Sequence, residues 1–171
     1  MKKDKNKRLI LLLLLIAVVS VCIAVWALCS KETPVILAPD RVPEQESNVE
    51  KIEDDADKKN EAPENGGAVS LTFSKDVSIN LADKTVDLYF ANPQRSTHDV
   101  VLQIIIRDNL IAQSGTISPG NKLSELELTD NAAKILSKGS YDGKFVVHYY
   151  DIESGEKAVL NTEIPINVKV N

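Results

Sequence analysis

The chain has 171 residues, a length that accommodates one globular core and additional segments. It carries 20 Lys and Arg residues against 25 Asp and Glu residues, a net charge of −5. This acidic balance argues against nucleic acid as a partner, because nucleic-acid binders present a basic surface. We expect neither a metal nor a cofactor.

The N-terminal 29 residues predict a membrane anchor with one transmembrane helix. Residues 1–8 contain five basic side chains and one acidic one, and the 21 residues of segment 9–29 carry no charge. A helix of that length covers about 31 Å, which matches the hydrocarbon core of a bilayer. The basic cluster places residues 1–8 in the cytoplasm and the rest of the chain outside the cell membrane. Lys7, Arg8 and Trp26 then lie at the membrane interfaces, in contact with lipid.

Two alternatives to this anchor remain open, a cleaved signal peptide with its site near residues 25–27 and a lipoprotein modified at a cysteine. The apolar run is longer than a signal-peptide core, and neither Cys22 nor Cys29 follows a small residue. The two cysteines lie near one face of the helix. They act there either as small hydrophobic side chains or as a contact face for self-association of two copies.

Segment 30–67 is predicted to be an acidic, disordered tether. Between residues 40 and 65 it holds ten acidic and four basic side chains, and its few apolar residues are too scarce to form a buried face. Low hydrophobicity combined with high charge does not offset the entropy that is lost on ordering. We expect a solvated spacer that holds the outer domain away from the membrane and ends at Gly66 and Gly67.

Residues 68–171 predict an all-β domain of the sandwich type. Apolar and polar residues alternate in short runs with turn residues between them, and no cysteine is present to staple the fold. We expect strands at 68–73, 77–81, 84–91, 98–107, 110–114, 122–128, 141–150 and 157–170. A single helical turn is expected at 132–136, where Thr129 and Asp130 provide the cap.

A resemblance to immunoglobulin-like sandwiches begins at this helical turn. The sequence LSKGSY, followed by DGKFVVHYYD, resembles the E–F corner of such a fold, although the domain lacks the immunoglobulin cysteine pair and core tryptophan. The resemblance implies that Tyr141 is a structural corner residue whose hydroxyl bonds backward to the backbone. The stretch VDLYFANPQRSTHDVVLQIIIRD, with SGTISPG after it, is similar to bacterial surface β-sandwich modules.

The whole plan of anchor, acidic tether and one sandwich is similar to small single-pass membrane proteins of Gram-positive bacteria, some of them carried on conjugative elements. It implies an extracellular C-terminal domain, with the N-terminus in the cytoplasm.

The sequence contains no catalytic constellation with useful spacing. Ser96, His98 and Asp99 are near neighbours on one strand, so they do not converge on a nucleophile. Neither a nucleophile elbow nor a glycine-rich phosphate loop is present. We therefore expect that the protein is not an enzyme.

A candidate partner surface follows from two strands that are apolar on both faces, 98–107 and 141–150. If Val100, Leu102, Ile104 and Ile106 fill the core, the other face of the first strand presents Val101 and Ile105. The two strands are neighbours in a sandwich of this type, so their outward residues form one patch. The patch comprises Val101, Ile105, Val146, His148 and Tyr150.

Two hypotheses describe this patch and two describe the function. Either the patch docks another protein, since monomers seldom leave contiguous apolar surface open, or a loop or the tether covers it.

The first functional hypothesis is a membrane-anchored extracellular module that binds an envelope or extracellular protein. The second is a structural accessory subunit of a membrane assembly, such as a secretion or conjugation apparatus, whose span makes the contacts.

Overall fold

The computed structural model describes residues 14, 15, 17–20, 38–53 and 69–171. The chain divides into two compact units, Met1–Val35 and Ile36–Asn171, and each is described by itself. In the first unit, residues 14, 15 and 17–20 are helical. Within the described ranges, no helix is both long enough and apolar enough to cross a membrane.

Most of the predicted span 9–29 lies outside the described residues. The same holds for the basic tail 1–8 with Lys7 and Arg8, for Trp26, and for Cys22 and Cys29. The membrane anchor and its self-association therefore stay predictions.

The second unit confirms the expected all-β class. Its elements are β1 (Val49–Lys51), β2 (Thr72–Phe73), β3 (Asp76–Asn80), β4 (Thr85–Asn92), β5 (His98–Ile106), β6 (Asn109–Gln113), β7 (Asn121–Glu127), α2 (Ala132–Ile135), β8 (Gly139–Asp151) and β9 (Lys157–Val170). The one helical turn stands where the sequence predicts it, between β7 and β8.

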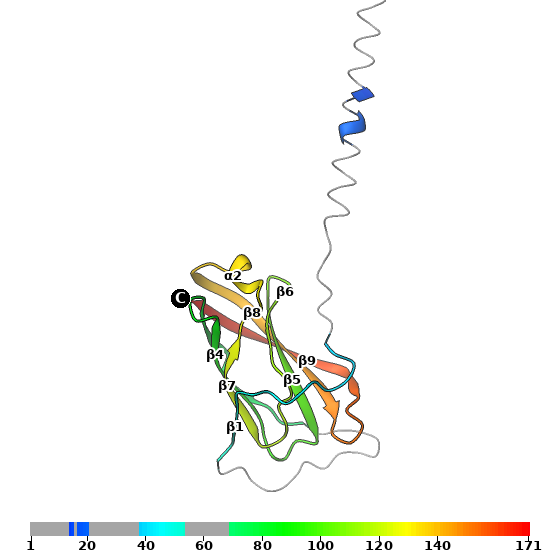
Figure 1. Ribbon diagram of the computed structural model, residues 1–171, viewed down its shortest axis with the longest axis vertical. Helices are drawn as coiled ribbons and strands as arrows, with labels where there is room; N and C mark the ends of the chain where they lie inside the picture. The colour runs from blue at the N-terminus through cyan, green and yellow to red at the C-terminus, as the bar shows by residue number, and fades with distance from the viewer. Residues whose placement is uncertain (1–13, 16, 21–37, 54–68) are drawn as a thin grey trace, which may run out of the picture. The chain divides into compact units, whose positions relative to one another are not determined.

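The strands form one hydrogen-bonded sheet in the order β1-β7-β4-β3-β9-β8-β5-β6, with β2 beside β4. Strand β3 runs antiparallel to β4 and parallel to β9, so it joins the two halves of the sheet. The sheet curls until its ends approach, where Ala112 of β6 bridges to Leu128 just after β7. Figure 1 shows β4 and β7 on one side of the domain and β5 and β6 on the other.

The core lies inside this curl and follows the two-residue period of the strands. Phe90 of β4 meets Phe145 of β8 edge to face, with ring centroids 6.0 Å apart. The fully or nearly fully buried core side chains of β5 and β9 are Val100, Leu102, Ile104, Ile106, Ile164, Ile166, Val168 and Val170. The inward face predicted for β5 is therefore confirmed.

Residues 38–53, which we call the strap, correct the prediction of a disordered tether. They pack on the β domain, and the bonds that hold them come mainly from the backbone: Val42 N–H donates to the Gly155 carbonyl at 2.9 Å, and Glu46 N–H donates to the Thr116 carbonyl at 3.0 Å. The strap ends in β1, which pairs with β7 (Figure 1). Composition failed as a guide here because backbone hydrogen bonds do not require apolar side chains. The other tether residues, 30–37 and 54–67, lie outside the described residues.

The strap approaches the domain most closely at Gly115, in the connection between β6 and β7. A Cβ atom on this residue would lie 2.7 Å from the Glu44 carbonyl oxygen and 2.9 Å from the Glu46 nitrogen, both of which are backbone atoms. The Gly115 N–H also donates to the Glu46 carboxylate at 2.6 Å. Glycine is therefore required here for close approach of two backbones.

We predict that Gly115→Ala detaches the strap without unfolding the core, because the added methyl group collides with strap backbone. Trypsin should then cleave at Arg41 and Lys51 about tenfold faster or more, which corresponds to a loss of about 1.4 kcal/mol of docking. Ser118→Ala, in the same connection, serves as the control. Equal cleavage rates in the two variants would show that Gly115 does not hold the strap.

Candidate functional site

The candidate site is the outer face of β5 and β8, the face that points away from the core. The two strands are antiparallel neighbours, with Val101 opposite His148 and Gln103 opposite Val146. Alternate residues of a strand point to opposite sides, so the residues between the core positions share this outer face. The structure therefore brings together the five side chains that the sequence assigns to one patch.

The prediction that this patch is open for a partner is wrong. Each of its five side chains is buried, with exposed fractions of 0% for Val101, 4% for Ile105, 7% for Val146, 4% for His148 and 0% for Tyr150. At the Tyr150 end the strap is one cover, because the Tyr150 hydroxyl donates to the Pro39 carbonyl at 2.8 Å. At this end of the face, the structure therefore agrees with the alternative hypothesis that a loop or the tether covers the patch.

A buried polar network crosses the same face and includes one residue that the sequence analysis missed, Gln103. Its amide nitrogen donates to the Gln113 side-chain oxygen of β6 at 2.7 Å, and its amide oxygen lies 3.0 Å from His148 Nε2. Because an amide oxygen only accepts, His148 Nε2 carries the proton. The two-residue alternation that places Val101 and Ile105 on the outer face also places Gln103 there, between them. Gln103 could therefore have been assigned to this face from the sequence.

The other ring nitrogen, His148 Nδ1, is buried and has no hydrogen-bond partner among the described residues. Burial, and to a smaller extent the positive charge of Lys157, together lower the pKa of His148 from 6.5 to about 4. The residue directly opposite His148 on β5 is the uncharged Val101, and its neighbours on the same face are Gln103 and Asp99. The imidazole is therefore neutral at neutral pH and acts as a hydrogen-bond donor within the network.

Tyr141 makes the backward hydrogen bond that the immunoglobulin-like resemblance implies. Its hydroxyl donates to the Ser137 carbonyl at 2.8 Å and accepts from the Ser137 N–H at 3.1 Å, just after α2. The hydrogen bond with the Ser137 hydroxyl at 3.1 Å, followed by the backbone bond from Ser137, lowers the pKa of the Tyr141 hydroxyl. The guanidinium of Arg107 lies 4.8 Å from the ring centroid, a cation–π contact that fixes the ring over the end of β5.

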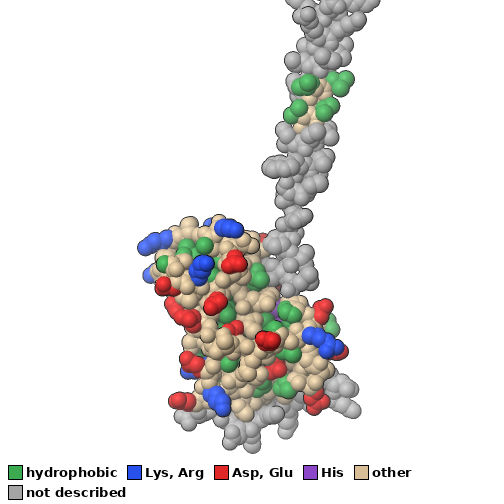
Figure 2. Space-filling model, viewed as in Figure 1, with side chains coloured by type: hydrophobic (Ala, Val, Ile, Leu, Met, Phe, Trp, Pro, Cys, Tyr) green, Lys and Arg blue, Asp and Glu red, His purple; other side chains and the backbone are tan. Residues whose placement is uncertain are grey.

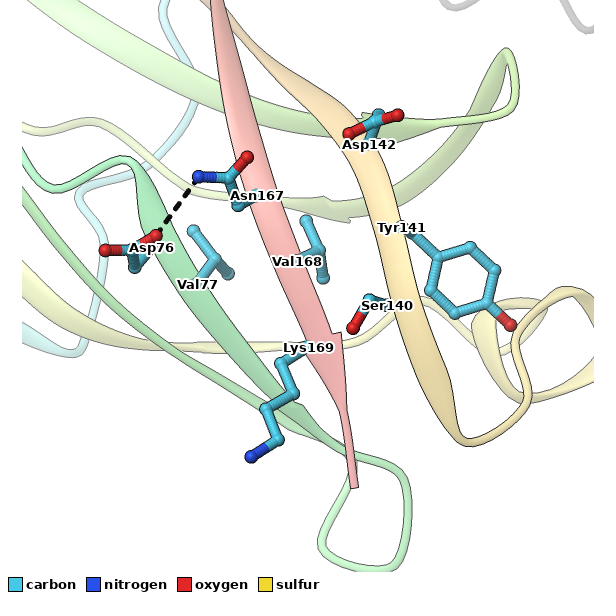
Figure 3. Close-up of a pocket in the computed structure, with 8 residues that line it drawn as sticks. All are labelled: Asp76, Val77, Ser140, Tyr141, Asp142, Asn167, Val168 and Lys169. Carbon is cyan, nitrogen blue, oxygen red and sulfur yellow. Dashed lines mark hydrogen bonds between the residues drawn. The ribbon is translucent and has the colours of Figure 1, made fainter.

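Among the described residues, the pocket at β3, β8 and β9 contains two carboxylates, those of Asp76 and Asp142. The pocket drawn in Figure 3 has a volume of about 520 Å³ and lies at β3, β8 and β9. Asn167 donates to Asp76 there, while Asp142 points away from this pair and Tyr141 points to the far side of β8. The two carboxylates therefore do not form an acid–base pair.

The Ser96, His98 and Asp99 grouping is not a catalytic set either. The Ser96 hydroxyl donates to the Ser70 carbonyl at 3.0 Å and accepts from the Ser70 N–H at 3.1 Å, so it anchors a loop. Among the residues that the structure describes, no group of three or more His, Cys, Asp or Glu side chains could hold a metal ion. On the face seen in Figure 2, hydrophobic side chains occur in small groups between acidic and basic ones.

Comparison of the sequence with models of known families and with characterised proteins gave no match. Among solved structures, the chain is similar to AggA, the major subunit of aggregative adherence fimbriae type I from Escherichia coli. The identity is 11%, the match covers 66% of this chain and 100% of AggA, and the TM-score is 0.33. It is also similar to the periplasmic chaperone SfaE, at 12% identity and a TM-score of 0.38, over 61% of this chain and 56% of SfaE. At these values neither likeness carries a functional argument.

We predict that acid destabilises the protein through His148. The unfolded chain binds a proton at this residue near pH 6.5, whereas the folded protein binds it only near pH 4. The stability from the neutral imidazole is therefore fully present above about pH 6.5 and is lost as the pH falls towards 4. The difference is about 3 kcal/mol in the free energy of unfolding.

Urea unfolding at pH 7.5 and 4.5 tests this, with His148→Gln beside the wild type. The variant should lose most of the wild-type difference between the two pH values. His98→Gln, at the only other histidine, should keep it. The same pH difference in His148→Gln and in wild type would refute the assignment.

Tyr141→Phe should lower the free energy of unfolding by about 1 kcal/mol, because it removes the hydroxyl that bonds Ser137. Chemical denaturation measures the change. Tyr89→Phe, on a side chain that is 40% exposed, provides a control that should leave stability nearly unchanged. Equal stability of the two variants would mean that the corner bond contributes nothing.

Proposed function

We propose that the chain is a membrane-anchored, non-catalytic module of the bacterial cell envelope, which displays a β-sandwich outside the membrane and binds another protein. The observation that carries this proposal is segment 9–29, whose 21 uncharged residues follow a cluster of five basic side chains. Leu14, Leu15, Val18 and Val19 within it are helical and 48–63% exposed. Exposed apolar side chains on a helix suit a lipid environment.

We further propose that the β domain is immunoglobulin-like. The order of its strands supports this, because β5, β8 and β9 are neighbours in one half of the sheet and β4 and β7 in the other. Strands C, F and G and strands B and E are arranged in this way in immunoglobulin domains. The Tyr141 bond to Ser137 supports the same assignment.

A binding role is supported by the chemistry of the domain. Among the described residues, the two carboxylates of the pocket at β3, β8 and β9 do not form an acid–base pair, and Gln103 and His148 on the outer face of β5 and β8 are engaged in a structural network. Because the strap covers the Tyr150 end of that face, a protein partner must bind elsewhere or displace the strap.

One observation favours a second candidate function, that of an accessory subunit in a membrane assembly. The burial of the predicted docking patch leaves the domain with less apolar surface for a partner. Contacts made by the span itself would then carry the association.

Replacing residues 9–29 with an unrelated span should leave partner capture intact for the binding module and abolish it for the accessory subunit.

The topology is tested on intact protoplasts that express the full chain. Added protease should remove the β domain, while a fragment that contains residues 1–29 stays in the membrane pellet after an alkaline carbonate wash. A cytoplasmic marker protein that resists the protease shows that the protoplasts are sealed. A protected domain, or a domain released into the medium without protease, would contradict the proposal.

A further inference from the structure

The hairpin between β8 and β9 carries the most exposed apolar side chains of the β domain. The pairing shifts from His148 opposite Asn161 to Tyr150 opposite Lys157, so Ala158, Val159 and Leu160 bulge opposite one residue of β8. Val159 is 102% exposed and Leu160 is 77% exposed. We call residues 151–160 the β8–β9 tip. Within the part of the chain that the structure describes, this apolar pair protrudes into solvent.

The strap begins at this tip and is fixed to it. The Lys157 N–H donates to the Asp40 carbonyl at 3.2 Å, and the backbones of Arg41 and Glu156 pair in an isolated antiparallel β-bridge. Val159 lines a shallow hollow together with Asp40 and Arg41. The point where the chain enters the domain therefore lies directly beside the exposed pair.

This attachment shortens the link between the proposed span and the domain. A tether that ran from residue 30 to residue 67 would reach more than 100 Å, whereas the eleven steps from Cys29 to Asp40 reach about 40 Å at most. If residues 9–29 cross the membrane, this link keeps the start of the strap, and the tip beside it, within about 40 Å of the lipid surface. Such a short link gives the tip a high local concentration at the bilayer, so that weak contacts suffice.

We propose that the β8–β9 tip inserts Val159 and Leu160 into the outer surface of the lipid bilayer. This insertion would orient the domain with the tip towards the membrane. The inference rests on the proposed membrane anchor. Two adjacent aliphatic side chains are too small an area for a stable protein interface, but they suit the boundary between headgroups and acyl chains.

The charges around the tip define the kind of lipid surface that it fits. The tip and the start of the strap carry the acidic residues Asp40, Asp151, Glu153 and Glu156, against the basic residues Arg41 and Lys157. The excess of acids disfavours anionic headgroups. Contact therefore comes from apolar insertion, and anionic lipid weakens it.

A fluorescent probe tests this in the full chain, reconstituted in phosphatidylcholine vesicles. Cys22 and Cys29 are replaced by Ser, and an environment-sensitive label is attached to Val159→Cys. Asp83→Cys provides the matched control, because the turn that contains Asp83 adjoins the far end of β9, about 40 Å from the tip. The label at position 159 should show blue-shifted emission, strong quenching by brominated lipid chains and little quenching by iodide. The label at position 83 should show the reverse.

A second variant and lipid series sharpen the test. Leu160 is an exposed side chain that does not support the fold. Leu160→Asp should shift the emission of the label at position 159 towards the wavelength that the label shows in water. Replacing part of the phosphatidylcholine with phosphatidylglycerol should weaken the blue shift.

The outcomes separate the two proposals. A chain that does not float with the vesicles overturns both the anchor and the docking of the tip. A chain that floats but leaves position 159 open to iodide overturns the docking alone. Protection from iodide without quenching by brominated lipid indicates contact with a second copy of the chain, and it also overturns the proposal.

Discussion

Strand β5 is apolar on both faces, and the domain therefore needs a cover on each side of it. Val100 and Leu102 face the core, while Val101 and Ile105 face the other way and are equally buried. A strand with two buried faces needs packing partners above and below the sheet. The strap provides one of them at the Tyr150 end, so the folded domain includes residues far ahead of Gly66 and Gly67.

The strap docks mainly through its backbone, and this explains how an acidic, polar segment can become ordered. Its main-chain groups bond Gly155, Thr116 and Lys157, and Gly115 leaves room for the two backbones to meet. Most of its side chains remain at least partly exposed, where charge costs little.

The place where the strap begins connects the fold to the proposed location of the protein. Asp40 and Arg41 are held at the β8–β9 tip, so the link from the proposed span to the domain is at most the segment from residue 30 to residue 39. In the arrangement that we propose, this short link restricts the orientations of the domain and favours one particular end at the bilayer. The surface that remains available to a protein partner is then the part of the domain away from this tip.

Local patterns did not predict β1, but they were sufficient to predict the strands after residue 68 and the helical turn, because the two-residue period records which side chains are buried. They also placed Val101, Ile105, Val146, His148 and Tyr150 on one face, since alternation and strand neighbours fix that grouping. The Tyr141 bond could be anticipated because it joins residues only four apart. The docking of the strap depends on contacts between residues more than 70 positions apart, such as Pro43 with Thr116, which local composition does not encode. The docking of the strap buries the Tyr150 end of the patch and places the tip beside Asp40. Both features therefore depend on the tertiary structure and could not be predicted from the sequence.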